Sequence, residues 1–195
     1  VIVSTYQAVS GAGKEGIDEL DAQVRDHSEG REMTANILPS ASAEKHYPIA
    51  FNLIPQIDVF CDNLYTKEEM KMVNETKKIM EDYEMRITAT TIRVPVYRSH
   101  SESVNIELEK EVDLGAMREA LAKFPGVTVQ DDPSKQEYPM PLYTSEKDDV
   151  YVGRLRRDES CEKSYNIWVV GDQIRKGAAL NTLQIAETMI KNGWI

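Results

Sequence analysis

The sequence predicts an α+β domain with a mixed or antiparallel sheet and helices packed on one face. Two observations predict this class. Most of the strand-like segments are joined by turns rather than by helices, and the last two of them are spaced as a closing antiparallel pair. A length of 195 residues with 41% apolar residues is sufficient for a sizeable core.

Apolar spacing of two residues predicts strands, and spacing of three to four predicts helices. Strand-like alternation occurs in Val1–Thr5, Arg86–Arg98, Val104–Leu108, Val127–Gln130, Tyr151–Arg157 and Tyr165–Val170. Helical spacing occurs from Glu15 to between Val24 and His27, from Thr66 to about Tyr83, from Asp113 to Phe124, and from Asp172 to about Asn192. Residues 28–48 and 131–149 are polar and irregular, and we expect loops there.

Local signals support several of these elements. Thr66 and Glu69 stand three apart and form a capping box at the start of the second helix. Pro95 cannot donate to a ladder, so the strand that contains it is expected at a sheet edge or at a bulge, with Val104–Leu108 as its partner strand. Gly126 follows the third helix, where a C-terminal cap belongs.

Composition excludes several classes of function. A net charge of −10 and a pI near 4.9 argue against nucleic acid or an anionic membrane as a partner. No apolar run approaches bilayer length, and no signal-peptide pattern is present. Cys61 and Cys161 lack zinc-ligand spacing, so we expect a reduced, cytoplasmic protein without a metal. Because Val1 lies within a strand pattern, we expect the protein to continue upstream.

The segment "SGAGKEG" contains a Gly-x-Gly-x-x-Gly motif at Gly11, Gly13 and Gly16. A dinucleotide fingerprint must follow a strand, open a helix, and precede a second strand that ends in an acidic residue about 20 residues later. Residues 29–34 are polar and supply no such strand. We therefore reject the dinucleotide interpretation, although this loop can still offer backbone N–H groups to a ligand.

Four blocks together resemble aspartate-semialdehyde dehydrogenase. They are "VSTYQAVSGAG" from Val3, "TKEEMKMVNETKKIM" from Thr66, "IRVPVYRSHSESVNIE" from Ile92 and "WVVGDQIRKGAALNTLQIAE" from Trp168. The resemblance implies the carboxy-terminal catalytic and dimerisation domain, with a fold like that of glyceraldehyde-3-phosphate dehydrogenase. It further implies that an amino-terminal NADP-binding domain and the catalytic cysteine precede Val1.

The family reaction reduces L-aspartyl-4-phosphate to L-aspartate-4-semialdehyde with NADPH and releases phosphate. The resemblance places it in the biosynthesis of lysine, threonine, methionine and diaminopimelate. A cysteine thiolate attacks the acyl phosphate, and hydride reduces the resulting thioester. Such chemistry requires a cationic grip on the substrate, a proton-transferring group and donors for the developing oxyanion.

Arg93 and His100 match the family's substrate-carboxylate arginine and its acid/base histidine. A guanidinium fork suits a carboxylate, and an imidazole suits proton exchange near neutral pH. Their spacing of seven would place them on opposite faces of one ideal strand, so a turn, Pro95 or a bulge must bring them together. The pattern alone favours a polar turn residue for His100 and a surface cation for Arg93, and it is the resemblance that selects the catalytic interpretation.

Further contacts are implied for residues from other segments. Glu68 and Lys71 share a helix face and match residues near the substrate's amino group and phosphate, although an exposed ion pair is the commoner meaning of this spacing. Gln7 matches the glutamine beside the cysteine. The remaining matched residues contact the cofactor: Ser10, Gly11 and Gln173.

The last helix is apolar around most of its circumference, which calls for burial on more than one side. We therefore expect two parts, a substrate-binding and dimerisation domain in residues 1–171 and a helix in 172–195 that packs on the nucleotide-binding domain. Outside that domain, the helix is expected to be exposed, displaced or covered by a neighbour. A homodimer or homotetramer is expected. Two alternatives stay open: an inactive stand-alone dimerisation module, and a related acyl-phosphate reductase with another substrate.

Overall fold

The computed structural model describes residues 1–195 and centres on a six-stranded mixed sheet in the order β2-β1-β3-β6-β5-β4. The strands are β1 (Ile2–Gln7), β2 (Thr88–Arg93), β3 (His100–Glu107), β4 (Val127–Val129), β5 (Val150–Arg157) and β6 (Ser164–Gly171). The pairs β1–β2 and β4–β5 are parallel, whereas β1–β3, β3–β6 and β5–β6 are antiparallel. The predicted α+β class with a mixed sheet is confirmed.

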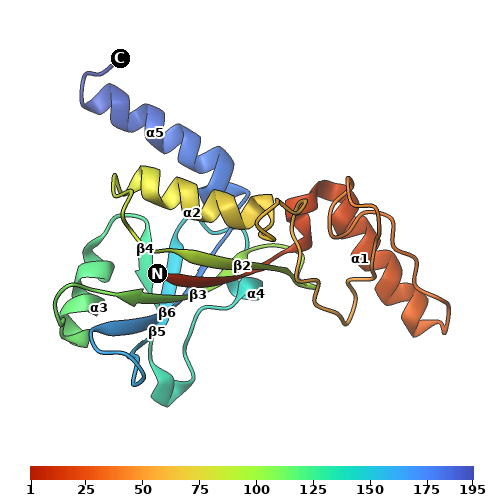
Figure 1. The fold of residues 1–195 in the computed structure, drawn as a ribbon, viewed down its shortest axis with the longest axis horizontal. Coiled ribbons are helices and arrows are strands. Elements are labelled where there is room, and N and C mark those ends of the chain that lie inside the picture. The colour runs from red at the N-terminus through yellow and green to blue at the C-terminus, as the bar shows by residue number, and fades with distance from the viewer.

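The α-helices are α1 (Gly13–Ser28), α2 (Lys67–Ile79), α3 (Leu114–Lys123), α4 (Pro141–Thr144) and α5 (Leu180–Lys191). Short turns of other helix types are η1 (Val9–Ala12), η2 (Pro133–Lys135) and η3 (Arg175–Ala179). The expected loop at 131–149 therefore contains two helical turns. Figure 1 shows α2 lying along the β2 edge of the sheet, with α1 and the long segment after it on one side.

The strand register defines two faces of the sheet. Thr5 lies opposite Glu102, which in turn lies opposite Val169, so these residues share the face that α2 and α3 cover. On that face α3 packs through Met117 against Tyr165, which is fully buried. The opposite face carries small polar residues of β1 and β3, and the rings of Tyr6 and Trp168 lie 5.7 Å apart there.

The segment predicted as one long strand at 86–98 is shorter than expected, and its expected pairing is wrong. Strand β2 ends at Arg93, and residues 94–99 form a turn that contains Pro95. β2 does not pair with β3, because β1 lies between them. The turn carries the chain across the carboxyl end of β1. Pro95 thus lies outside the ladder, and β2 occupies the edge of the sheet.

Glu69 fixes α2 to this edge strand. The predicted capping box is present: Thr66 accepts a hydrogen bond from the Glu69 N–H, and the Glu69 carboxylate accepts one from the Thr66 N–H at 2.8 Å. The other carboxylate oxygen accepts the N–H of Thr91 in β2 at 3.0 Å. One buried side chain therefore sets both the start of α2 and its position beside the sheet.

The irregular segment after α1 is held by polar side chains of that helix. Glu19 accepts the N–H groups of Asn36, Ile37 and Leu38. One turn later, Gln23 accepts the N–H groups of Ile49 and Ala50 and donates to the Thr34 carbonyl. These contacts cover a small apolar core comprising Val9, Leu20, Leu38, Ile49, Ala50 and Ile54.

No strand forms between residues 28 and 53, so the second strand of a dinucleotide fold is absent, as the sequence predicts. Glycine is required at two positions of the motif for structural reasons rather than for binding a dinucleotide. Gly13 has φ of +79°, which disfavours a side chain. A Cβ on Gly16 would lie 2.5 Å from the Val9 carbonyl oxygen, so this glycine permits the close packing of α1 on η1.

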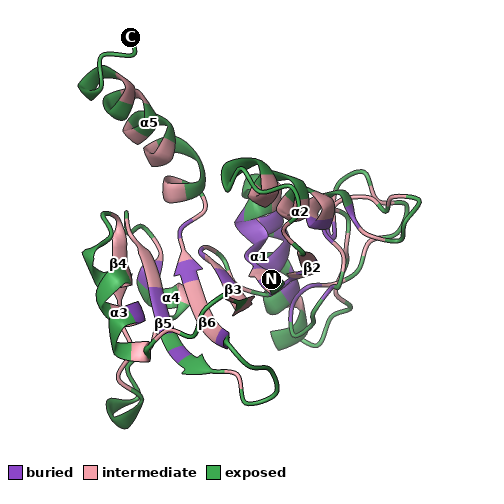
Figure 2. Ribbon diagram, turned by 60° about the vertical axis from the view of Figure 1, so that its left-hand side comes forward, coloured by how far each residue is buried: buried purple, intermediate pink, exposed green.

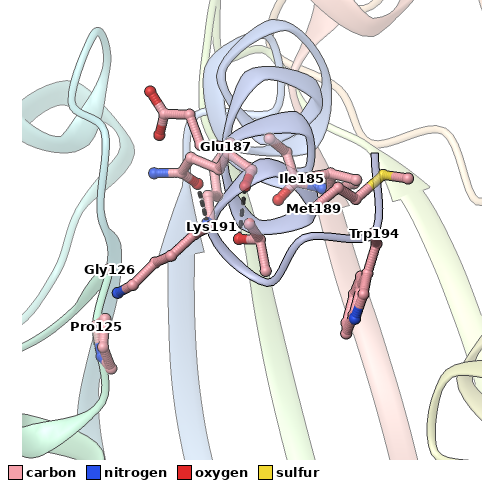
Figure 3. A pocket seen from close by; sticks show the side chains of 11 residues that line it. Pro125, Gly126, Ile185, Glu187, Met189, Lys191 and Trp194 are labelled. Atoms are coloured by element: carbon pink, nitrogen blue, oxygen red, sulfur yellow. Dashed lines mark hydrogen bonds between the residues drawn. The ribbon is translucent and has the colours of Figure 1, made fainter.

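The C-terminal helix projects from the rest of the molecule (Figure 1), and none of its residues is buried (Figure 2). A cleft of about 630 Å³ separates it from the turn at Pro125 and Gly126 (Figure 3). Lys176 of η3 donates to the Gln184 side chain of α5 at 2.5 Å, and both side chains line this cleft. Exposure of this helix agrees with the expectation from its sequence. None of the helices combines the length and the apolar character that crossing a membrane requires.

Candidate active site

The carboxyl ends of β1 and β2 and the start of β3 lie together at one end of the sheet. Gln7 at the end of β1 is in register with Arg93 at the end of β2. On the other side of β1, Tyr6 is opposite Ser101, which places His100 beside Gln7. Arg93 and His100 therefore converge from two strands that flank β1. A spacing of seven residues would place them on opposite faces of a single strand, but the turn at 94–99 puts them on two different strands.

Arg93 is a buried cation without an anionic partner in the chain. It is 4% exposed and forms no salt bridge, and its Nη1 donates to the Ala8 carbonyl at 2.7 Å. Its Nε has no hydrogen-bond partner. Burial lowers the pKa of the guanidinium to about 10, against an opposing effect of Glu68. Because a buried charge is costly unless it is paired, this arrangement is suited to binding an anion.

His100 is held in one neutral tautomer. Its Nδ1 accepts the N–H of Ala8 at 3.1 Å, so Nδ1 carries no proton and the neutral ring carries its proton on Nε2. Burial, reinforced by the positive charge of Arg93 and opposed by Asp172, lowers the pKa of His100 from 6.5 to about 3. The ring therefore presents a neutral Nε2–H donor to the site.

Gly11 shows how closely these groups approach the loop. A Cβ on Gly11 would lie 2.7 Å from Arg93 Nη1 and 3.6 Å from both Cε1 and Nε2 of His100. The loop after β1 thus covers the cation and the imidazole together. A side chain at this position would displace Arg93.

Glu68 lies between Gln7 and Lys71. Its Oε1 accepts from the Gln7 side chain at 3.3 Å, and its Oε2 pairs with Lys71 Nζ at 3.1 Å. This contact raises the pKa of Lys71. The Glu68 side chain is 23% exposed and that of Lys71 is 57% exposed, so the pair opens toward solvent while Gln7 stays buried.

Gln173 joins the loop after β1 to the turn before β3. Its amide nitrogen donates to Ser10 Oγ at 2.7 Å, and its oxygen accepts the Ser99 N–H at 3.2 Å. Ser10 is buried beside Gly11. The structure therefore brings together all the residues that the sequence analysis selected, in two connected groups around the end of β1.

Two contributors escaped the sequence analysis. The backbone N–H of Ala8 contacts His100 and its carbonyl contacts Arg93, and a backbone contact leaves no signal in the residue type. In the sequence, Asp172 marks only the start of the last helical segment, yet it is fully buried and its negative charge favours protonation of His100. No group of three or more His, Cys, Asp or Glu side chains is arranged to hold a metal ion.

Comparison with known proteins identifies relatives. Residues 1–176 match the family model described as "Semialdehyde dehydrogenase, dimerisation domain". The chain is 50% identical to an aspartate-semialdehyde dehydrogenase of Aquifex aeolicus over 195 residues, which is 100% of this chain and 56% of that protein. The chain thus spans about half the length of the curated relatives that it matches.

Solved structures show the same similarity. An aspartate semialdehyde dehydrogenase II from Vibrio cholerae, complexed with ASA, is 42% identical with a TM-score of 0.87. The match covers 97% of this chain and 54% of the Vibrio chain. An aspartate semialdehyde dehydrogenase from Candida albicans, with NADP, covers 100% of this chain and 51% of its own at 22% identity and a TM-score of 0.67, and shows a shared fold.

The environment of His100 predicts its titration. We expect its ring resonances to show no titration between pH 5 and 8 in a histidine NMR experiment, because its folded pKa of about 3 lies below this window. The unfolded chain protonates near pH 6.5, so the contribution of His100 to stability is fully present above that pH. It is lost as the pH falls toward 3.

The matched variant for this experiment is Arg93→Met, which removes the neighbouring cation but keeps an apolar stem. It should raise the pKa of His100 only in part, because burial is the larger cause of the shift. A wild-type His100 that titrates near pH 6.5 would contradict the buried, neutral tautomer.

Proposed function

The chain belongs to the semialdehyde dehydrogenase family, as its dimerisation domain, and we propose that it forms the substrate-binding half of an aspartate-semialdehyde dehydrogenase. The complete enzyme reduces L-aspartyl-4-phosphate to L-aspartate-4-semialdehyde with NADPH and releases phosphate. The observation that carries this proposal is the buried, unpaired guanidinium of Arg93 beside the neutral imidazole of His100. The relatives' names supply the reaction, and the site supplies groups that suit it.

Arg93 binds the α-carboxylate of the substrate. Its Nη1 is already fixed on the Ala8 carbonyl, so the guanidinium is oriented before the ligand arrives. A carboxylate accepts two parallel N–H bonds from such a fork and neutralises the buried charge. On this proposal, the missing partner of Arg93 is the substrate itself.

Glu68 and Lys71 bind the amino group and the phosphate, respectively. They lie on the first turns of α2, whose position is fixed by Glu69, and Gln7 holds Glu68 from the sheet side. Lys71 stays more exposed than Glu68, as a group that meets an incoming phosphate would be. Gln7 helps to orient the acyl group, since its amide both donates and accepts without adding charge.

His100 acts through Nε2. With Nδ1 occupied by the Ala8 N–H, the neutral ring can donate a hydrogen bond or a proton only from Nε2, which faces the loop at Gly11. In the proposed reaction this donor serves the oxygen on which negative charge develops at the acyl carbon. Returning the proton to Nε2 completes its acid/base role.

NADPH, when bound, supplies the hydride. The residues present suit an edge contact with it rather than its main binding site. Gln173 uses its oxygen and one N–H inside the protein, which leaves one amide N–H and the Ser10 hydroxyl proton for a ligand. Gly11 keeps the loop free of a side chain at the same place. Ser10, Gly11 and Gln173 therefore contact the cofactor, while the preceding domain holds most of it.

The remaining features of the proposal concern assembly. Residues 1–171 form the substrate-binding domain and associate as a homodimer or homotetramer, in keeping with the matched dimerisation-domain family. Residues 172–195 dock on the nucleotide-binding domain. The enzyme works in the cytoplasm, without a metal, nucleic acid or membrane partner, in the biosynthesis of lysine, threonine, methionine and diaminopimelate.

The first test is the activity of the full-length protein with aspartate semialdehyde, phosphate and NADP, followed as NADPH formation. We expect Arg93→Leu to raise the KM for the semialdehyde strongly, because a bidentate carboxylate contact is lost. Arg86→Leu removes an exposed arginine near the other end of β2 and is the control. An unchanged KM in Arg93→Leu would exclude the substrate assignment and favour a related reductase with another substrate.

His100→Ala should lower kcat in the same assay by about 10²- to 10⁴-fold, since a group that exchanges a proton in the reaction is removed. The KM should change less than kcat if the ring acts on the reacting oxygen rather than on the bound carboxylate. Near-normal turnover would remove His100 from this role.

Hydrogen–deuterium exchange tests the docking of α5. In the 195-residue chain we expect rapid exchange of the amides of Leu180–Lys191, because the helix has no buried residue. In the full-length protein the same amides should be protected by the nucleotide-binding domain. Equally rapid exchange in both proteins would refute the docking proposal.

A further inference from the structure

Asp172 is a buried carboxylate at the end of β6, outside the group of residues that contact substrate in the proposed function. It is 0% exposed and accepts the N–H groups of Glu146 at 2.7 Å, Ile174 at 2.9 Å and Arg175 at 3.2 Å. Its Oδ2 also pairs with Arg98 Nε at 2.6 Å. Burial alone would raise the pKa of Asp172, but these hydrogen bonds outweigh it and lower the pKa.

Asp172 and its neighbour Gln173 together contact both sides of the active site. Arg98 and Ser99 immediately precede His100 in the chain, and Gly171, next to Asp172, is opposite His100 in the β3–β6 register. Gln173, which follows Asp172, binds the Ser99 N–H and Ser10 Oγ. Two consecutive residues at the end of β6 therefore hold the turn before His100 and the loop that covers it.

That turn needs to be held. Ser99 has φ of +71°, in the left-handed region that a serine seldom adopts, and it is fully buried. Such a conformation persists when surrounding contacts over-determine it. Among these contacts are the Arg98–Asp172 ion pair and the hydrogen bond from the Ser99 N–H to the Gln173 oxygen. The Ser145 hydroxyl adds contacts to the Ser99 hydroxyl and the Arg98 carbonyl.

We propose that Asp172, together with Arg98, is a positioning residue that fixes His100 against the Ala8 N–H. Asp172 also links this geometry to residues 174–175, at the start of the C-terminal helical segment. The catalytic readout rests on the proposed function. The same carboxylate binds the first N–H groups of the turn that leads into α5, at Ile174 and Arg175. Because Asp172 binds both segments, a movement of residues 174–175 also moves the turn before His100.

The simpler alternative is that Asp172 only caps the turn beginning near Arg175. A cap affects stability but not the imidazole. The two roles separate because Asp172 also acts on His100 electrostatically, opposing the effects of burial and of Arg93. The other charged groups around a cavity next to His100 are Glu102 on β3, whose pKa burial raises, and Lys176 on η3.

The chain offers a matched control at the far edge of the sheet. Asp131 follows β4, its side chain is 1% exposed, and it pairs with Arg118 at 2.8 Å. It also accepts the N–H groups of Arg154 at 2.7 Å and Leu155 at 3.3 Å. Asp131→Asn therefore disturbs the same kind of buried ion pair as Asp172→Asn, with β6 and β5 separating it from β3.

The experiment compares full-length wild type, Asp172→Asn and Asp131→Asn by kcat, KM, Tm and NMR of ¹³Cε1-labelled histidine. We expect both variants to lower Tm. Only Asp172→Asn should lower kcat, by about 10- to 100-fold, because displacement of a catalytic group by about 1 Å can have that effect. Its KM should stay within about threefold, since Arg93 is untouched, and only its His100 resonance should move.

Arg98→Gln is the second variant, for the case in which Asp172→Asn does not fold. The Arg98 side chain is 27% exposed, and its loss leaves Asp172 with its backbone donors. A similar fall in kcat and a displaced His100 resonance are expected, because the turn before His100 loses the same ion pair. If wild type lacks the proposed activity, the proposed function fails, and the His100 resonance alone decides the role of Asp172. Equal kcat losses in both aspartate variants, or an unmoved His100 resonance with kcat retained, would overturn the proposal.

Discussion

The candidate site depends on two hydrogen bonds made by the backbone of Ala8. Its N–H donates to His100 Nδ1, and its carbonyl accepts from Arg93 Nη1. Two successive peptide units, joined at the Cα of Ala8, therefore set the tautomer of the imidazole and the orientation of the guanidinium. Ala8 directly follows β1, which lies between β2 and β3. The positions of the Arg93 and His100 side chains are therefore fixed relative to that strand. The rest of the fold serves to bring β2 and β3 to either side of that strand.

Local features of this arrangement could be predicted from the sequence, and non-local ones could not. Thr66 and Glu69 predict the start of α2, because both partners of a capping box lie within four residues of the sequence. The sequence does not reveal that Glu69 also binds the Thr91 N–H, since nothing in β2 marks the residue whose N–H points outward. The resemblance to a known family selected Arg93 and His100. The separation of their strands by β1 is a property of topology, which apolar alternation does not encode.

Polar side chains of α1 show the same limit. Glu19 and Gln23 sit one turn apart and would be assigned to a solvated helix face by residue type alone. Instead, each is buried and supplies acceptors to backbone N–H groups of the irregular segment at 34–50. That segment lacks strands, so its buried N–H groups need acceptors from elsewhere in the chain. An irregular segment that packs over a core therefore recruits polar residues into the core. Charge patterning underestimates how ordered such a segment is.

The electrostatics of Arg93 and His100 favour an anionic ligand. Burial disfavours the charged forms of both Arg93 and His100, and the positive charge of Arg93 further disfavours protonation of His100. Without an anion, the chain holds one cation and one neutral donor. A carboxylate on Arg93 would cancel part of the positive potential that His100 experiences, and would thereby ease transfer of a proton to the ring. On the proposed function, substrate binding and the proton chemistry of His100 are coupled through the guanidinium. Asp172 acts in the same sense, because its negative charge opposes the effects of burial and of Arg93 on the pKa of His100.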